Sequence, residues 1–181
     1  MVNTGSKTGV DGIVANGNAP IVIIPKSKIG TAPTRETKEL KKSAVDDEAS
    51  VKADCYLNAD GYQVTRTAET RQRQRLCEKN KVTVKTGETI EAQMTFVWDG
   101  QNKKTEMNKV YDVLAEGSEV YIAQAYGLDS DAEWTASSTI CDVVRATVSM
   151  RAKNTPVEGE DLTVTATLSV KEYFEDCQVV A

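Results

Sequence analysis

A two-residue alternation of apolar and polar side chains recurs along the chain and constrains its fold more than any other feature. Between Thr89 and Asp99, every second position is apolar: Ile90, Ala92, Met94, Phe96 and Trp98. The same period runs through residues 140–150 and 162–174. Successive side chains of a strand point to opposite faces, so this pattern predicts half-buried strands and a mainly β chain.

One segment has helical spacing instead. Between Lys103 and Glu116, apolar residues recur at intervals of three or four: Met107, Val110, Tyr111 and Leu114. These positions form one stripe of a helix, and glycine, here Gly117, is a common helix terminator. We predict a single flanking helix at about 103–116, packed against the sheet by this stripe and followed by a strand at 118–126.

Turn residues suggest two further boundaries. The Asp60-Gly61 pair separates the alternating segment 51–58 from a second one that begins at Tyr62, which predicts a β-hairpin turn. Pro20 and Pro25 enclose a short apolar run. Because proline cannot donate to a strand ladder, we predict an edge strand there.

The length of 181 residues suits one domain. Residues 1–18 are rich in glycine, asparagine, threonine and serine and are predicted to be a flexible N-terminal arm, so that 19–181 form the domain. Within it, residues 26–50 hold few apolar side chains, chiefly Ile29, Leu40 and Val45, and are expected to be a long loop that does not order alone. Two interpretations stay open: a floppy insertion, or an arm that orders against a neighbouring subunit.

The composition argues against most catalytic chemistry. The chain contains no histidine, which excludes histidine-based triads and metal ligands. It also lacks the glycine-rich phosphate loops and the nucleophile motif of hydrolases. We therefore predict a protein that is not an enzyme, with no catalytic, cofactor-binding or metal-binding residues and no cofactor.

Four cysteines are spread through the sequence. None belongs to a C-x-x-C pair. At this density, in a chain of this length, buried apolar thiols are favoured over a disulfide framework. We expect reduced thiols. They are Cys55, Cys77, Cys141 and Cys177.

Three alternating arginines interrupt this acidic chain of net charge −5. Arg71, Arg73 and Arg75 would share one face of a strand. Such a stripe could touch phosphate, but nucleic-acid binding usually needs a wider basic surface. A solvated or subunit-contacting face is the favoured interpretation.

The segment 128–138 combines acidic side chains with a tryptophan. Asp129, Asp131 and Glu133 suggest a calcium loop, but the EF-hand spacing is absent and calcium is disfavoured. Trp98 is expected in the core because it shares the apolar face of its strand. The role of Trp134 is left open.

The first ten residues contain no apolar stretch typical of a secretion signal. The longest apolar run, Ile21–Ile24, is too short to cross a bilayer. We expect synthesis and retention in the cytosol unless other machinery carries the protein out.

A series of short motifs over 50–181 resembles the tail tube, or major tail, proteins of long-tailed, non-contractile bacteriophages, especially those of actinobacteria. The motifs are Asp54-Cys55-Tyr56-Leu57 with Asp60-Gly61, Arg75-Leu76-Cys77, Thr95-Phe96-Val97-Trp98, Leu114-Ala115-Glu116-Gly117-Ser118 and Tyr121-Ile122. Their order and spacing are more specific than any one of them. The arginine-rich run before Leu76 departs from the family pattern.

This resemblance implies a β-barrel or sandwich with one flanking helix. It further implies that six copies close into a ring and that rings stack into a hollow tube through which DNA passes without specific binding. The long loop and N-terminal arm would contact adjacent rings. Implied partners are a tape measure protein and tail terminator and distal tail proteins, and the implied location is the virion, after assembly in the host cytoplasm.

Two hypotheses from other classes remain. One is a secreted β-sandwich adhesion or carbohydrate-binding module, and the other is a hydrolase on a β scaffold. For the tube, we expect acidic side chains to outnumber basic ones on the lumen, because repeated phosphate contacts would hold DNA in place. Glu69 and Glu91 are candidates for that lining.

Overall fold

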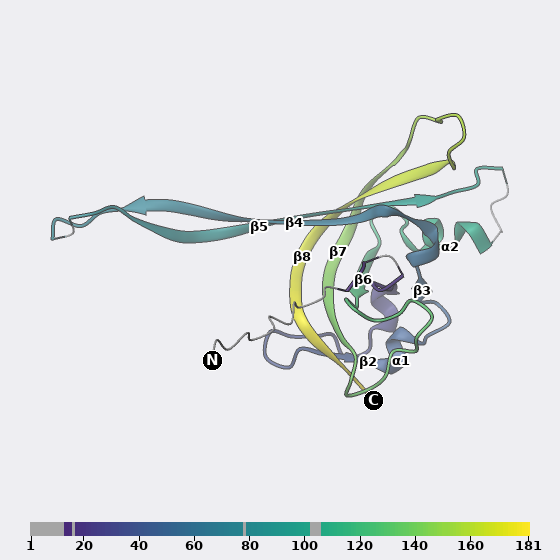
Figure 1. Ribbon diagram of the computed structural model, residues 1–181, viewed down its shortest axis with the longest axis horizontal. Coiled ribbons are helices and arrows are strands. Elements are labelled where there is room, and N and C mark those ends of the chain that lie inside the picture. The colour runs from purple at the N-terminus through teal and green to yellow at the C-terminus, as the bar shows by residue number, and fades with distance from the viewer. Residues whose placement is uncertain (1–12, 16, 78, 102–105) are drawn as a thin grey trace, which may run out of the picture.

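The computed structural model describes residues 13–15, 17–77, 79–101 and 106–181 (Figure 1). The strands are β1 Ile21–Pro25, β2 Glu39–Lys41, β3 Val51–Lys52, β4 Leu57–Arg73, β5 Val82–Val97, β6 Glu119–Gln124, β7 Ile140–Lys153 and β8 Thr163–Val180. The helices are α1 Lys42–Val45 and α2 Lys109–Val113, with short 3₁₀ helices η1 Lys26–Lys28, η2 Asp54–Tyr56 and η3 Glu106–Asn108.

All of these strands belong to one eight-stranded sheet. Its order is β3-β1-β6-β7-β8-β5-β4, with β2 added in parallel beside the end of β8. The other pairings are antiparallel. The predicted mainly β class is therefore confirmed. In Figure 1 the long strands β7 and β8 curve around the body, and the β4–β5 hairpin extends far beyond it.

The first hydrophobic core lies on one face of the sheet, beneath α2. It includes the predicted inward face of β5, where Met94 and Phe96 are fully buried and Ala92 is nearly so. Val164, Ala166 and Leu168 of β8 join it. The alternation of apolar residues therefore predicted the buried part of both strands. Two details are wrong: Leu162, expected to face inward, is 51% exposed, and β5 begins at Val82 rather than at Thr89.

A second hydrophobic core forms on the opposite face of β1, β6 and β7 and on the last third of β8. Alternate residues of β6 are buried in the two cores. Val120 and Ile122 lie in the first core, and Tyr121 and Ala123 lie in the second. Trp134, whose role the sequence left open, is 2% exposed in this second core.

The expectation that residues 26–50 cannot order alone is wrong. Ile29, Leu40, Ala44 and Val45 are buried in the second core, although they are widely spaced in the sequence. This segment contains η1, β2 and α1, and β2 pairs with β8. Few apolar residues suffice here because they converge on a surface supplied by distant strands.

The predicted helix is shorter than expected. Its described part consists of η3 and α2, and residues 103–105 of the predicted range lie outside the described residues. Val110 and Leu114 are fully buried and Tyr111 is partly buried, as the stripe predicts. Met107 is 48% exposed, so its assignment to the packed stripe is wrong.

The Asp60-Gly61 pair does not form a hairpin turn. Strand β4 continues through it with an irregularity in register between Leu57 and Tyr62. A Cβ atom on Gly61 would lie 2.6 Å from the carbonyl oxygen of Thr95, so glycine permits a close backbone approach here. The actual turn of the hairpin connects Arg73 to Val82.

The edge-strand prediction for residues 20–25 is also wrong. Strand β1 lies between β3 and β6 and pairs with both. Its prolines lie at or beyond its ends, where they leave the central ladder intact. The predicted arm 1–18 is described only at residues 13–15, 17 and 18, and the rest of it lies outside the described residues.

Candidate assembly surfaces

The outer part of the β4–β5 hairpin extends away from the body (Figure 1). Strand β5 pairs with β8 only from Glu91 to Val97, so residues 66–90, called here the distal hairpin, pair only with each other. None of its described residues is buried, and only Val84, Gly87 and Ile90 are partly exposed rather than fully exposed. At about 3.3 Å per residue, Arg66–Arg73 extends about 25 Å.

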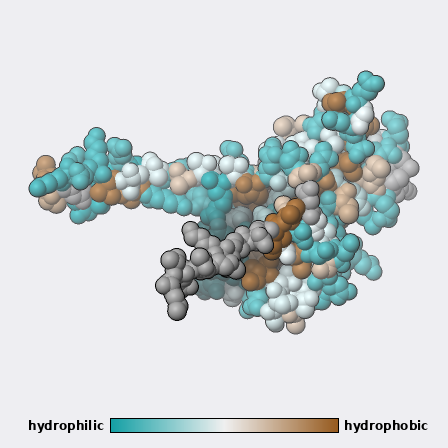
Figure 2. All heavy atoms as spheres, in the orientation of Figure 1, coloured by the Kyte–Doolittle hydropathy of each residue, from teal (hydrophilic) through white to brown (hydrophobic). Residues whose placement is uncertain are grey.

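The distal hairpin differs from the rest of the chain in charge. Residues 66–90 contain seven basic and three acidic residues, a net charge of +4. The remaining 156 residues contain 15 basic and 24 acidic ones, a net charge of −9. Figure 2 shows a mostly hydrophilic surface along this projection. A basic projection and an acidic body attract each other when they belong to different copies.

The three predicted arginines lie on this projection. Arg71 and Arg73 occupy alternate positions of β4 and share a face, as expected. Strand β4 ends at Arg73, so Arg75 lies in the connection between β4 and β5 rather than on the strand. All three are exposed.

An ionic cluster ties the base of the distal hairpin to the body. The Arg66 Nε donates to Glu88 Oε1 at 2.6 Å, and its guanidinium also contacts Glu175 of β8. The Lys85 ammonium lies 2.7 Å from Glu88 Oε2. Hydrogen bonds from Arg66 and then Lys85 lower the pKa of Glu88 to about 2. The carboxylate therefore stays charged over the whole physiological range.

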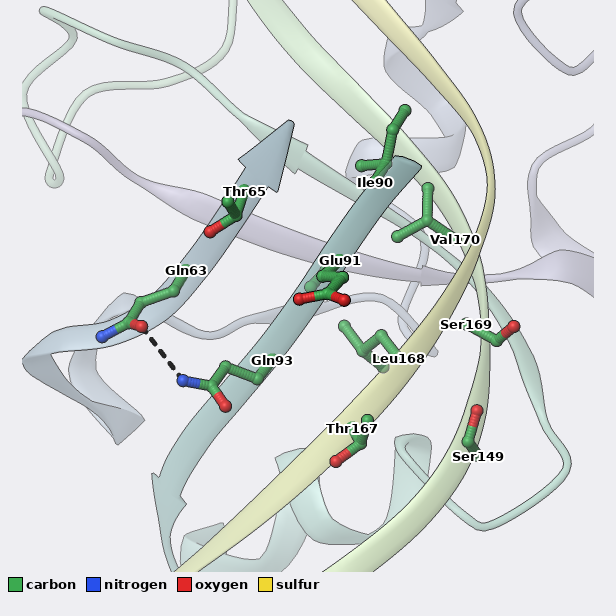
Figure 3. A pocket seen from close by; sticks show the side chains of 11 residues that line it. Gln63, Thr65, Ile90, Glu91, Gln93, Ser149, Thr167, Leu168, Ser169 and Val170 are labelled. Carbon is green, nitrogen blue, oxygen red and sulfur yellow. Dashed lines mark hydrogen bonds between the residues drawn. The ribbon is translucent and has the colours of Figure 1, made fainter. Parts of the chain in front are cut away.

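The opposite face of the sheet from the first core is polar where β4, β5, β7 and β8 meet. A shallow hollow of about 620 Å³ opens on it (Figure 3). Hydroxyl and amide side chains dominate its polar lining: Gln63, Thr65, Gln93, Ser149, Thr167 and Ser169. The Gln93 Nε2 donates to Gln63 Oε1 at 3.0 Å. Glu91 is the one charged residue among those lining the hollow.

Of the two carboxylates predicted for a lumen, Glu91 lies in this hollow. Glu69 lies further out on the hairpin, where its Oε1 accepts a hydrogen bond from Thr89 Oγ1 at 2.7 Å. The structure therefore does not bring the two together. The alternate threonines of β8 are visible in the sequence and mark its polar face. Which residues of β4, β5 and β7 continue that face depends on how these strands are aligned with one another.

A second hollow of about 410 Å³ lies where β4 begins and β5 ends, at the end of the β4–β5 hairpin that is opposite its turn. Its lining residues are Cys55, Val97, Trp98, Asp99, Met107, Asp161 and Leu162. The buried Asn108 fixes this corner, because its Nδ2 donates to the Asp99 carbonyl at 2.9 Å and its Oδ1 accepts from the Asp99 amide at 3.0 Å. The Trp98 ring packs against Tyr111 with centroids 5.6 Å apart.

A charged network spans η1, β6, β7 and β8. Glu119 accepts hydrogen bonds from Lys26 Nζ at 2.8 Å and Arg145 Nε at 2.7 Å, and Lys171 Nζ lies 3.2 Å from it. Arg145 also donates to Glu172 at 2.8 Å. The hydrogen bonds from Lys26 and then Arg145 lower the pKa of Glu119 to about 2.

The cysteines fall into two classes. Cys141 and Cys177 are buried in the second core, as expected. Cys55 and Cys77 are exposed free thiols, so the expectation of burial is wrong for these two. Burial raises the pKa of the Cys141 thiol to about 12 and that of Cys177 to about 11. The two buried cysteines therefore act as apolar core residues.

The acidic segment 128–138 has a structural role. The amide of Asp131 donates to Asp129 Oδ1 at 2.8 Å, which closes a turn. Across the described residues, no group of three or more histidine, cysteine, aspartate or glutamate side chains is arranged to hold a metal ion. None of the described helices is long and apolar enough to span a bilayer.

Comparisons with known proteins define the class. A sequence model of the family described as phage tail tube protein matches residues 7–181. The chain therefore belongs to the phage tail tube protein family, and is a structural component of a phage tail. The resemblance seen in the sequence is confirmed. No curated protein matches the chain.

The likeness to a solved tail tube shows the same fold. The SPP1 tail tube structure is 9% identical, with a TM-score of 0.56 over 92% of this chain and 81% of that one. The baseplate structure of the anti-feeding prophage is also 9% identical, with a TM-score of 0.48 over 91% of this chain and 95% of that one.

Proposed function

We propose that copies of this chain associate into rings of roughly six subunits, and that these rings stack into a hollow tube that conducts DNA. Membership of the tail tube family and the likeness to the SPP1 tail tube support an assembly of this kind. Family membership favours this proposal over the adhesion, carbohydrate-binding and hydrolase hypotheses.

The distal hairpin carries the argument for self-association. A two-stranded hairpin without a packing partner is marginally stable in water. Here, eight residues of β4 project beyond the sheet, with one edge of β4 unpaired among the described residues. Exposed edges of this length invite pairing with another chain. A neighbouring subunit would cover both the hairpin and the edge.

The polar face around Glu91 is the candidate lumen lining. Hydroxyl and amide groups offer a duplex no strong phosphate contact, and the carboxylate repels it. The residues lining that hollow include one acidic and no basic side chain. This composition supports a wall along which DNA slides, with acidic side chains in excess over basic ones.

Further contacts with tail components belong to the same proposal. A tape measure protein would occupy the lumen before DNA, and tail terminator and distal tail proteins would close the two ends. Both kinds of partner follow from the role of a tube subunit. Segments 1–18 and 26–50 are proposed to take part in contacts between rings.

Negative-stain electron microscopy of the concentrated protein tests the assembly. We expect rings or tubes, with class averages that count the subunits. Light scattering over a range of concentrations and salts provides the complementary readout. A stable monomer under every condition contradicts the proposal, and rings of another size correct the subunit number alone.

A further inference from the structure

An apolar side chain stands at the tip of the basic projection. The tip consists of the described residues 74–77 and 79–81, between the end of β4 and the start of β5. Leu76 is fully exposed there, at 111% of its reference area. Arg75, Lys79 and Lys81 surround it in the sequence and are exposed too. A lone exposed leucine is ordinary, but its place at the end of a projection is not.

The hollow beside Trp98 has the complementary character. Met107 and Leu162 contribute apolar surface and are 48% and 51% exposed. Two carboxylates, Asp99 and Asp161, lie at the same hollow, and none of the described residues that line it is basic. The ammonium group of Lys153 lies 4.4 Å from the centroid of the Trp98 ring.

The tip and this hollow lie at opposite ends of one hairpin. Strand β5 runs from the tip at Val82 to the hollow at Val97, a distance of about 50 Å at the usual rise per residue. In Figure 1 the turn of the hairpin and helix α2 lie on opposite sides of the molecule. The hollow of one copy can therefore receive only the tip of another copy.

We propose that Leu76 of one copy inserts into the hollow lined by Trp98, Met107 and Leu162 of a second copy, with the basic tip facing Asp99 and Asp161. This inference rests on the proposed self-association and specifies one of its contacts. The contact joins two different surfaces, so it repeats from copy to copy and produces a closed ring or an extended filament. Apolar insertion contributes affinity, and the opposite charges select this orientation over its reverse.

Two native cysteines allow a direct test. Cys77 adjoins Leu76, and Cys55 lines the receiving hollow. A short bismaleimide added to the assembled protein should link Cys55 of one copy to Cys77 of another, as peptide mapping would show. The single variants Cys55→Ser and Cys77→Ser should both abolish the cross-link. Cys141 and Cys177 are buried and should not react.

The cross-link alone does not distinguish two hollows, because Cys55 also borders a neighbouring hollow lined by Ala15, Leu57 and Tyr62. Point variants identify which of the two is occupied. Leu76→Ser and Leu162→Ser should each weaken association by about 10- to 100-fold, the value of one buried leucine side chain. Both residues are exposed in the single chain, so folding should be unaffected. Val157→Ser, in the β7–β8 connection and about as exposed as Leu162, should leave association unchanged.

The outcomes separate this contact from self-assembly as such. Rings or tubes in which the cross-link is absent, or joins Cys77 to Cys77, overturn the inference and leave the proposed function intact. A Cys55–Cys77 cross-link that survives with unchanged affinity in Leu162→Ser also overturns it, because the tip then occupies the neighbouring hollow. A protein that neither assembles nor cross-links overturns both proposals.

Discussion

The body of the protein and its distal hairpin differ in the burial of their side chains and in the sign of their charge. In the body, strands β1, β6 and β7 bury side chains on both faces, and two hydrophobic cores result. Along residues 66–90 no described side chain is buried, and the charge is +4 against −9 for the remainder. The body is stabilised by buried apolar contacts, whereas the described residues of the hairpin have only its strand pairing and exposed polar contacts. This difference is why the proposed contact between copies is assigned to the hairpin and the stability of the fold to the body.

Removing the hairpin should have the largest effect on assembly and a small one on folding. In a variant that replaces 70–86 with Asn-Gly, a type I′ turn joins Glu69 to its β5 partner Gly87. We expect rings and tubes to disappear in electron micrographs, while the β-type circular dichroism spectrum persists. Tubes that still grow would show that the distal hairpin is not needed for the contact between subunits.

A substitution in the body should do the reverse. Leu114→Ala removes a fully buried side chain from the first core and should lower the free energy of unfolding by about 2–5 kcal/mol. Met107→Ala, on the same helical segment but 48% exposed, is the matched control and should change it by less than about 0.5 kcal/mol. Denaturant titration measures both. Equal effects would contradict the separation of buried and exposed positions on this segment.

Acid should weaken the body through Glu119. Its pKa in the folded protein is about 2, against an ordinary value of 4.5. The ionised carboxylate therefore contributes stability above pH 4.5 that is lost as the pH falls from 4.5 to 2. Glu119→Gln should lower the melting temperature at pH 7, and its difference from the unmodified protein should vanish near pH 2. Glu160→Gln, at an exposed position of the β7–β8 connection, is the control and should leave the melting temperature unchanged at both pH values.

The smallest expected effect is on DNA. Despite its basic hairpin, the assembled protein should not retard duplex DNA at physiological salt, because in the proposed assembly the hairpins face acidic surfaces of other copies. Glu91→Lys would place a positive charge on the polar face of every subunit and should create binding that falls steeply with salt. Glu158→Lys, in the β7–β8 connection, should not. Tight binding by the unmodified protein would revive the phosphate-binding interpretation of Arg71, Arg73 and Arg75.

Local patterns in the sequence predicted the elements that bury only one of their faces. The alternation in 89–99 and 162–170 identified β5 and most of β8, and Val110 and Leu114 identified the packed side of α2. Prediction failed where the decisive contact is distant in the sequence. The Asp60-Gly61 pair is typical of a turn, but Gly61 instead allows the backbone of Thr95 to approach closely. Leu40 has few apolar neighbours in the sequence, but in the fold it lies beside β8.

The candidate surfaces were less predictable than the fold. The alternating arginines drew attention to 71–75, but nothing in the local pattern shows that β4 and β5 extend beyond β8. The hollow beside Trp98 gathers Cys55, Met107 and Leu162 from three separate segments. A sequence contains no short-range signal for such a convergence, because it depends on the register of β4, β5 and β8.

Because β6, β7 and β8 contribute side chains to both cores, the two cores have no boundary along which they could melt separately. Loss of either one would break strands that the other needs, so equilibrium unfolding should be a single cooperative transition. Each core has its own fluorophore: Trp98 packs against the first, and Trp134 lies within the second. In single-tryptophan variants of the unassembled chain, the two fluorescence transitions should coincide at one denaturant concentration.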